Sequence, residues 1–134
     1  MWIDQKFLVI EKILKNEKGS LLDLGSRDQI LKKFLPEKIN YTGVDISMNK
    51  NDNIIMDLNQ KFNFDNESFD FVTALDVAEH LDDPKTFIRE CLRVSKKKVL
   101  IVLPNVSYYE SRFRFLLKGN LGSKYHFSGD KRDD

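Results

Sequence analysis

Four aspartate residues close or directly follow short apolar runs of this sequence, where carboxylates can bind the hydroxyl and amino groups of a ligand. If these runs are parallel strands of one open sheet, their carboxyl ends lie along one edge, and ligands bind outside that edge. Each aspartate taken alone is equally consistent with a helix N-cap or a turn. Four of them at corresponding positions favour a binding site over that alternative. They are Asp23, Asp45, Asp57 and Asp76.

The first of these residues belongs to the segment Asp23-Leu24-Gly25-Ser26, which is typical of the strand–turn–helix of a nucleotide site. Gly25 allows the backbone to turn sharply and a ligand to approach without a Cβ atom in the way. Asp45 follows about twenty residues later, where such folds place a carboxylate that accepts the ribose hydroxyls. Asp23 would repel a pyrophosphate but attract an ammonium or a sulfonium. This combination favours an adenosyl ligand that carries those groups, S-adenosylmethionine.

A scaffold of strands and helices is needed to bring these residues together. Because the expected strands alternate with helices, we predict an α/β fold whose sheet is parallel and has crossover connections. The apolar spacing predicts strands over residues 20–24, 41–46, 53–56, 69–75 and 98–103, and helices over residues 3–14, 29–35, 84–94 and 107–117.

The composition indicates a globular protein of 134 residues with 41% hydrophobic residues. Its 22 basic and 21 acidic side chains nearly cancel, so no net field favours nucleic acid or a membrane surface. The single cysteine, Cys91, excludes an internal disulfide and suits a reducing compartment. The first residues lack the pattern of a signal peptide, and the longest apolar run, residues 99–103, is too short to cross a bilayer. We therefore expect a cytoplasmic protein that binds neither a membrane nor nucleic acid.

The last part of the sequence differs in character from the rest. Residues 107–117 have the spacing of an amphipathic helix with its aromatic side chains in the core, and the alternatives are a cover over the substrate or a contact with nucleic acid. From Gly119 onward the chain is polar and shows no strand pattern. We expect a single domain over residues 1–118, and a polar C-terminal tail over residues 119–134 that is disordered or belongs to a missing part.

Between residues 20 and 105 the sequence contains an ordered set of motifs, which resembles that of class I SAM-dependent methyltransferases, most closely the small type 11 branch. The resemblance implies a Rossmann-like three-layer sandwich with a mostly parallel sheet in the order 3-2-1-4-5. It also implies transfer of the sulfonium methyl of S-adenosylmethionine to a small-molecule acceptor, with S-adenosylhomocysteine as product. The motifs are residues 21–25, 41–47, 69–72, 79–84, 93–94 and 99–105.

The resemblance also implies a role for each matching position. Asp23 would reach the ammonium of the methionine moiety, and Asp45 would accept the ribose hydroxyls. Asp57 would approach the adenine amino group, with Ile46 and Leu58 against the ring. The cofactor-binding residues implied in this way are Asp23, Gly25, Ser26, Asp45, Ile46, Asp57, Leu58 and Asp76.

The segment Asp76-Val77-Ala78-Glu79-His80 has several interpretations. The resemblance places Asp76 near the reacting methyl group. Some quinone-pathway O-methyltransferases carry a similar acid-x-x-Glu-His and use it to hold a divalent cation, which makes Asp76, Glu79 and His80 candidate metal ligands. His80 is also a candidate general base, since its unperturbed pKa suits proton removal near neutral pH. The alternative is that His80 only packs or caps the following helix, and we expect no metal.

Two departures from the family pattern leave the function open. Arg27 and Gln29 stand where the family usually has the second and third glycines of its first motif. They would reduce cofactor affinity, or Arg27 would contact the cofactor carboxylate. The late antiparallel strands are expected to be missing, which would leave the fifth strand as an exposed edge and allow a homodimer across it.

Two rival functions follow from the same residues. A non-catalytic SAM-binding or interaction module would explain the altered glycine loop. A nicotinamide-dependent oxidoreductase would use Asp45, but the glycine-rich pyrophosphate turn is absent, and Asp23 and Asp28 would repel the pyrophosphate. In a methyltransferase, alignment of donor and acceptor supplies much of the rate, which is consistent with a sequence that shows a cofactor site and no clear catalytic group.

Overall fold

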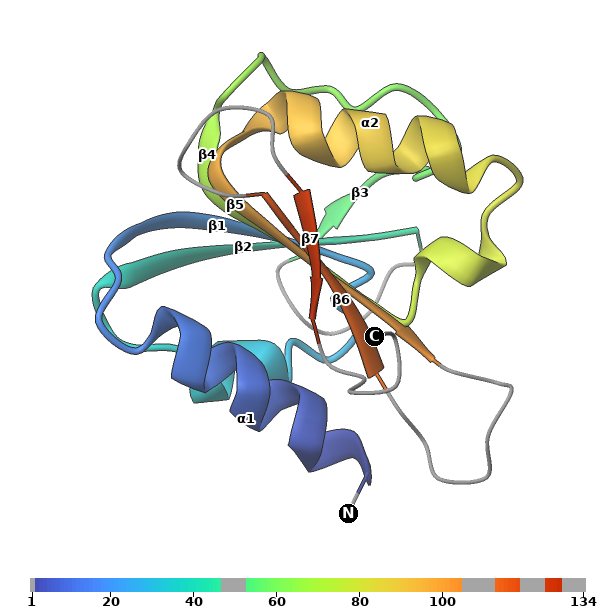
Figure 1. Ribbon diagram of the computed structural model, residues 1–134. Coiled ribbons are helices and arrows are strands. Elements are labelled where there is room, and N and C mark those ends of the chain that lie inside the picture. Colours follow the sequence, from blue (N-terminus) through green and yellow to red (C-terminus); the bar gives the residue numbers. More distant parts are fainter. Residues whose placement is uncertain (1, 47–52, 105–112, 119–124, 129–134) are drawn as a thin grey trace.

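A seven-stranded sheet lies at the centre of the computed structural model, which describes residues 2–46, 53–104, 113–118 and 125–128 (Figure 1). The strand order is β3-β2-β1-β4-β5-β6-β7. The strands are β1 (Gly19–Leu24), β2 (Ile39–Asp45), β3 (Ile54–Ile55), β4 (Phe69–Leu75), β5 (Ser95–Pro104), β6 (Phe113–Lys118) and β7 (Tyr125–Ser128). Among the described residues, the helices are α1 (Trp2–Leu14), α2 (Pro84–Val94) and the short 3₁₀ helices η1 (Leu31–Phe34) and η2 (Ala78–His80).

Strands β1 to β5 run parallel to one another, and their order confirms the predicted arrangement 3-2-1-4-5. In the register of the sheet, Leu22 of β1 lies between Thr42 of β2 and Val72 of β4. Leu21 and Leu22 are both fully buried although neighbouring side chains of a strand point to opposite faces. Burial of both faces is typical of parallel strands covered on two sides. The carboxyl ends of these strands therefore share one edge of the sheet.

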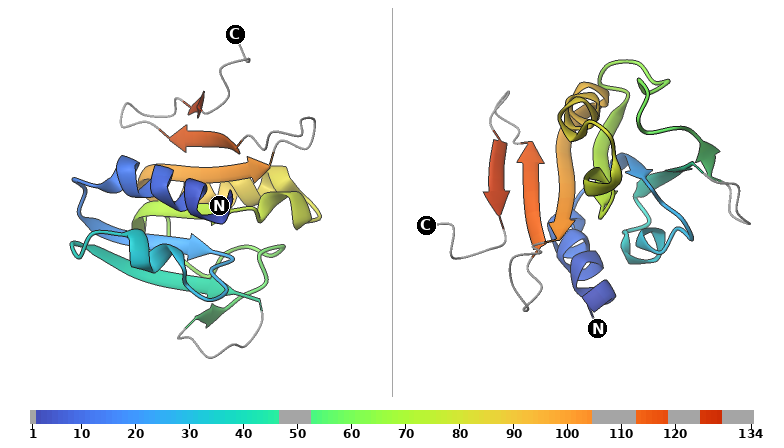
Figure 2. Two further views of the ribbon diagram at one scale, coloured as in Figure 1. Left: turned by 90° about the horizontal axis from the view of Figure 1, so that it is seen from below. Right: turned by 90° about the vertical axis from the view of Figure 1, so that its right-hand side faces the viewer.

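Helices cover both faces of the sheet, which gives the predicted three-layer sandwich. Figure 1 shows α1 on one side of the sheet and α2 on the other, and Figure 2 shows the same layers from two further directions. Each face has its own hydrophobic core because the strand side chains alternate between the faces. The core on the side of α1 includes Phe7, Ile10, Leu21, Phe71 and Leu100, and the core on the side of α2 includes Leu22, Val72, Phe87, Cys91 and Ile101.

Helix α1 brings its apolar stripe onto the sheet as its spacing predicts. Phe7, Ile10 and Leu14 are at most 6% exposed. The ring of Phe7 stacks on that of Phe34 in η1, with centroids 5.3 Å apart. The predicted helix over residues 29–35 forms only as the shorter η1. This packing fixes the residues of α1 that precede Phe7 beside the loops at the carboxyl edge.

Helix α2 begins and ends at the predicted residues, 84 and 94. Asp83 is its N-cap, and the Asp83 carboxylate accepts hydrogen bonds from Thr86 N at 3.2 Å and from Thr86 Oγ1 at 2.6 Å. Pro84 occupies the first turn, where a missing N–H is not needed. The helix follows η2, so its start is tied to the segment that leaves β4 at the carboxyl edge.

The expectation for the C-terminal part was wrong in three respects. Residues 113–117 belong to strand β6 rather than to a helix, and residues 107–112 lie outside the described residues. Strand β6 pairs antiparallel with β5, and β7 pairs antiparallel with β6, so late antiparallel strands are present. The tail expected over residues 119–134 contains β7. The physical reason is that, without β6, the N–H and C=O groups along the outer edge of β5 would lack hydrogen-bond partners. A neighbouring strand supplies these partners and a helix does not.

The pairing also removes the reason for expecting a homodimer across β5. Five residues of β5, from Leu100 to Pro104, pair with β6, so that stretch of the β5 edge is not free to bind a second copy.

No helix within the described part of the chain combines the length and apolarity needed to span a membrane.

Candidate functional site

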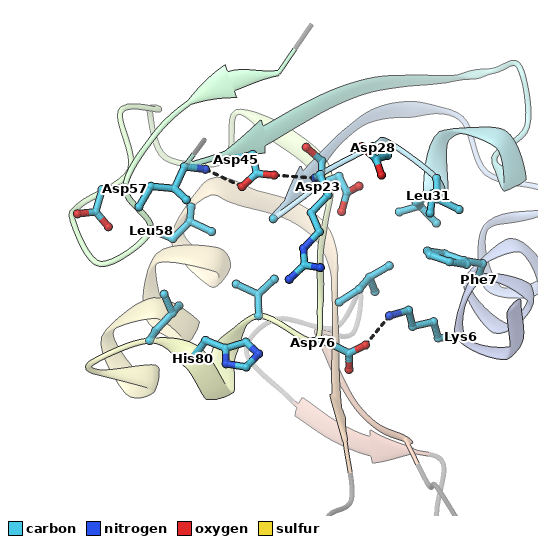
Figure 3. Close-up of a pocket in the computed structure, with 18 of the residues that line it drawn as sticks. Lys6, Phe7, Asp23, Asp28, Leu31, Asp45, Asp57, Leu58, Asp76 and His80 are labelled. Carbon is cyan, nitrogen blue, oxygen red and sulfur yellow. Dashed lines mark hydrogen bonds and ion pairs between the residues drawn. The ribbon is translucent and has the colours of Figure 1, made fainter. Parts of the chain in front are cut away.

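A cavity of about 580 Å³ lies at the carboxyl ends of the parallel strands, within the range of about 300 to 1,000 Å³ typical of small-molecule sites. Figure 3 shows how the labelled side chains from β1, β2, α1 and the segments after β3 and β4 surround it. Every residue predicted for the cofactor site, and His80, lines this one cavity. These residues are Asp23, Gly25, Ser26, Asp45, Ile46, Asp57, Leu58, Asp76 and His80.

The turn after β1 is fixed to the end of β2 by its backbone. The N–H groups of Gly25 and Ser26 both donate to the carbonyl oxygen of Val44, at 2.8 and 2.9 Å. Gly25 has a φ of 76°, and a Cβ atom there would lie 2.4 Å from Val77 Cγ2. A glycine is therefore required at this position both for the backbone conformation and for the close approach of Val77.

Asp23 is buried in the floor of the cavity at 3% exposure. Its carboxylate accepts a hydrogen bond from the Tyr41 hydroxyl at 2.6 Å and another from the Thr73 hydroxyl at 3.0 Å. Burial raises the pKa of Asp23 to about 6, although these two hydrogen bonds oppose the shift. Burial and the Asp23 carboxylate also raise the pKa of Tyr41, which therefore stays a neutral donor. The charge of Asp23 is costly here unless a cation binds nearby.

Asp45 ends β2 at the rim of the cavity and is 8% exposed. Its two carboxylate oxygens accept hydrogen bonds from backbone N–H groups, Oδ2 from Arg27 at 2.9 Å and Oδ1 from Ile46 at 2.7 Å. Each oxygen keeps a second lone pair for a further donor. The adjacent side chain of Ile46 is apolar and 63% exposed beside the cavity. A pair of hydroxyls next to an apolar ring would fit this arrangement.

The segment after β3 forms the wall that carries Asp57 and Leu58. Asp57 is exposed, and its Oδ1 accepts a hydrogen bond from Asn59 N at 2.9 Å, which holds a tight turn. Leu58 is 7% exposed and belongs to the core beneath α2. The core contact fixes Leu58, and the turn leaves the second oxygen of the Asp57 carboxylate available at the cavity surface.

Asp76, the first residue after β4, has a left-handed backbone conformation with a φ of 57°. Its N–H donates to the carbonyl oxygen of Val102 at 3.0 Å, and its Oδ2 accepts a hydrogen bond from Lys6 Nζ of α1 in an ion pair. Oδ1 of Asp76 is buried and has no hydrogen-bond partner among the described residues. Such an oxygen beside a cavity offers an acceptor for a donor group of a bound molecule.

The candidate metal ligands Asp76, Glu79 and His80 make other contacts in this structure. The Asp76 carboxylate pairs with Lys6, while His80 Nε2 lies 3.8 Å from Glu79 Oε2. Glu79 does not line the cavity. Among the described residues no group of three or more His, Cys, Asp or Glu side chains is arranged to hold a metal ion. His80 itself lines the cavity with a side chain that is 71% exposed, so it stands at the mouth, in contact with water.

The two positions where the family pattern has glycines retain a left-handed backbone. The φ of Arg27 is 47° and that of Gln29 is 58°. Arg27 lines the cavity and Gln29 does not. Residues other than glycine adopt this conformation only at a cost in free energy. The loop therefore has a backbone conformation that suits glycine, although Arg27 and Gln29 occupy these positions.

Several residues at the site have no counterpart in the sequence prediction. Lys6 and Phe7 of α1 line the cavity, and Asn53 contacts the loop after β1. For Lys6 a signal existed, because it flanks the apolar stripe of a helix that packs at this edge. For Asn53 no signal existed, because its partners lie more than twenty residues away in the sequence.

Comparison with protein-family models matches residues 4–121 to a family described as a methyltransferase domain. The match covers most of the chain. A comparison with curated proteins gives no match.

Several solved structures share the fold. The YcgJ protein from Bacillus subtilis has a TM-score of 0.66 and 18% identity, over 75% of this chain and 51% of that chain. A SAM-dependent methyltransferase from Aquifex aeolicus has a TM-score of 0.52 and 22% identity, over 71% of this chain and 62% of that chain. The [4+2]-cyclase SpnF has a TM-score of 0.65 and 19% identity, over 75% of this chain and 45% of that chain. The chain thus spans about half the length of these structures.

Proposed function

This chain belongs to the methyltransferase domain family, and from that premise we propose that it binds S-adenosylmethionine in the cavity and transfers the sulfonium methyl group to a small-molecule acceptor. The observation that carries the proposal is Asp45. Its carboxylate is held at the rim of the cavity by two backbone N–H groups and retains free lone pairs beside the exposed Ile46. This is the arrangement that adjacent ribose hydroxyls require.

The other donors and acceptors of the cavity fit the same ligand. Asp23 would stabilise the ammonium of the methionine moiety, directly or through a water molecule, since it is buried and carries a carboxylate. Asp57 would accept from the adenine amino group, with Ile46 and Leu58 on either side of the ring. A dinucleotide fits less well, because Asp23 and Asp28 both line the cavity where a pyrophosphate would lie.

S-adenosylmethionine, when bound, would supply an electrophilic methyl group: the lone pair of an acceptor bonds to the methyl carbon while the carbon–sulfur bond breaks, and S-adenosylhomocysteine is the leaving group. The chain itself contributes position and exclusion of water. Leu75 at the end of β4, and Val77 and Leu81 after it, line one side of the cavity, and these apolar side chains would keep water from the reacting centre. Alignment of the two reactants is the main source of rate for a displacement of this kind.

The acceptor would enter on the side of α1, where Lys6, Phe7 and Asp76 line the cavity. Oδ1 of Asp76, for which the described part of the chain offers no hydrogen-bond partner, would accept a hydrogen bond from the hydroxyl or amine of the acceptor. His80 would then take up the released proton, because it lines the cavity and is in contact with water. The cavity of about 580 Å³ has the size of a small-molecule site, which is consistent with the small-molecule acceptor proposed here.

A thermal denaturation series with S-adenosylhomocysteine and with NADH tests the proposal. We expect S-adenosylhomocysteine to raise the melting temperature in a concentration-dependent manner, because a ligand that binds only the folded state stabilises it. NADH at the same concentrations is expected to have no effect. Stabilisation by NADH alone would favour an oxidoreductase, and stabilisation by neither would contradict the proposed cofactor.

Transfer itself is tested separately with S-adenosylmethionine labelled on its methyl group and a panel of small phenols, amines and thiols. We expect label to appear in at least one acceptor with the unchanged protein, and more slowly with the His80→Gln variant. Binding of S-adenosylhomocysteine without transfer to any acceptor would instead favour a non-catalytic module.

A further inference from the structure

The side-chain amide of Asn53 contacts three residues of the loop after β1. Asn53 Oδ1 accepts hydrogen bonds from Ser26 Oγ at 2.6 Å and from Gln29 Nε2 at 2.7 Å. Asn53 Nδ2 donates to the carbonyl oxygen of Arg27 at 2.8 Å. One amide from the segment before β3 thus holds a loop more than twenty residues away in the sequence.

The loop needs such a restraint because of its backbone conformation. Arg27 and Gln29 are both left-handed, with φ of 47° and 58°, and neither is a glycine. In a free chain these residues favour other conformations. The contacts of Asn53 with the Ser26 hydroxyl, the Arg27 carbonyl oxygen and the Gln29 side chain favour the left-handed path, which glycines would adopt without such contacts.

The sequence also leaves space for the Asn53 amide. Gly43 of β2 faces it, and a Cβ atom at Gly43 would lie 2.4 Å from Asn53 Oδ1, 2.8 Å from Ser26 Oγ and 3.1 Å from Gln29 Nε2. Since Gly43 has no left-handed φ, its lack of a side chain serves this packing rather than the backbone.

The loop in turn orients the carboxylate of the cofactor site. The N–H of Arg27 donates to Asp45 Oδ2 at 2.9 Å, so the direction of this oxygen depends on the conformation of Arg27. We propose that Asn53 is a positioning residue for the cofactor, which replaces the missing glycines by holding the loop so that Arg27 N–H orients Asp45 toward the ribose. This rests on the proposed function, because the ribose is that of S-adenosylmethionine.

A purely structural role for Asn53 would have a different signature. An amide that only supports the fold would affect stability equally whether or not the loop contains glycines, and would leave the affinity of the folded protein unchanged. A positioning role makes the effect on affinity depend on residues 27 and 29. The two roles are therefore separated by a double-mutant comparison.

The test is calorimetric titration of the full chain with S-adenosylhomocysteine, well below the melting temperature. We expect Asn53→Ala to weaken binding about tenfold, a change that corresponds to about one strong hydrogen bond. In the Arg27→Gly/Gln29→Gly background, we expect the same substitution to weaken binding less than about twofold, because glycines need no restraint. An equal loss in both backgrounds, or no loss in the first, would overturn the proposal.

Two further variants keep the test informative if Asn53→Ala folds poorly. Gly43→Ala crowds the Asn53 amide and the Ser26 hydroxyl that it contacts, and it changes the identity of no residue that lines the cavity. We expect this variant also to weaken binding. Asn63→Ala removes an exposed asparagine that does not line this cavity and serves as the matched control, for which we expect unchanged affinity. Unchanged binding by Gly43→Ala would contradict the proposed role.

A second readout does not depend on the cofactor and so distinguishes failure of this proposal from failure of the proposed function. Hydrogen exchange at the amide of residue 27 reports its bond to Asp45. We expect Asn53→Ala to speed this exchange at least about tenfold in the original sequence, and much less in the glycine background. Failure of the protein to bind S-adenosylhomocysteine would contradict the proposed function. Unchanged exchange in Asn53→Ala would contradict the proposal that Asn53 positions the loop, whether or not the cofactor binds.

Discussion

At the scale of single residues, Asp23 is the one whose chemistry is most altered by the fold. It lies within β1, between two covered faces, and its carboxylate is surrounded by the hydroxyls of Tyr41 and Thr73. A buried carboxylate of this kind reduces stability when it is ionised. Its presence at a cavity is therefore better explained by a cationic ligand than by the requirements of the sheet.

We expect the Asp23→Asn variant to be more stable than the unchanged protein above about pH 6. The pKa of Asp23 is about 6 in the folded chain against an ordinary value of 3.8, so the folded state holds its proton more tightly and stability falls as the pH rises from 3.8 to 6. The gain is on the order of 2 to 3 kcal/mol at about pH 8 and should vanish below about pH 4. Denaturant unfolding at several pH values measures it.

The same substitution is expected to weaken the binding of S-adenosylmethionine, whose ammonium would lose its carboxylate partner. A gain in stability with unchanged affinity would show that Asp23 does not serve the cofactor. No gain at any pH would show that Asp23 is not held as a buried, destabilised acid.

The residues of the site could be predicted from the sequence only in part. Asp45 and Asp76 were accessible because each directly follows an apolar run, and parallel strands bring such ends together. The ion pair between Lys6 and Asp76 was not accessible, since it joins residues 70 apart whose proximity depends on the packing of α1. The contacts of Asn53 were missed for the same reason.

At the scale of elements, α2 matters for the site because it follows directly from the segment that contains Asp76 and His80. Its start is defined by Asp83, which accepts hydrogen bonds from both the backbone and the hydroxyl of Thr86. These bonds, the side-chain one first, lower the pKa of Asp83 below its ordinary value. A shift in this direction means that the cap is stabilising when ionised.

We expect Asp83→Ala to lower the melting temperature at neutral pH, because the first turn of α2 loses its cap. The contribution of an acid whose pKa is lowered on folding is present above its unfolded value of 3.8 and is lost as the pH falls through the folded value. The difference between the two proteins should therefore shrink in acid. The measurement is thermal unfolding of both proteins, monitored by circular dichroism at neutral and at acidic pH. A difference in melting temperature that persists in acid would contradict the role of the ionised Asp83 as the cap.

Most elements could be predicted from the sequence because their patterns are local. β4 and α2 occupy the predicted residues, since each is bounded by clear signals and has a regular apolar period. β6 was mistaken for a helix because a short apolar run is compatible with both periods. The choice was decided by the open edge of β5, which no local pattern reveals.

At the scale of the whole molecule, the antiparallel strands β6 and β7 extend a parallel sheet whose strands β1, β2 and β4 end at the cavity. Among the residues whose side chains the structure describes, those that line the cavity lie between residues 6 and 81. The pairing of β6 satisfies the backbone along β5 from Leu100 to Pro104. We therefore attribute to β6 a role in closing the sheet edge.

We expect a chain ended after Pro104 to self-associate. Removal of β6 exposes the hydrogen-bonding groups of a long apolar strand, which favours pairing with another copy. Size-exclusion chromatography with light scattering, compared with the full chain at equal concentration, measures the effect. A shortened chain that remains monomeric and equally stable would show that β6 does not protect this edge.

The most direct test of the cofactor site is calorimetric titration with S-adenosylhomocysteine of the unchanged chain, of Asp45→Ala and of Asp65→Ala. Asp65 is exposed and outside this cavity, so the last variant controls for loss of one negative charge. We predict saturable binding by the unchanged chain and by Asp65→Ala, and binding at least about tenfold weaker by Asp45→Ala, which loses charge-assisted hydrogen bonds to the ribose. Absence of binding by a chain that melts cooperatively, or equal binding by all three proteins, would contradict the proposed site.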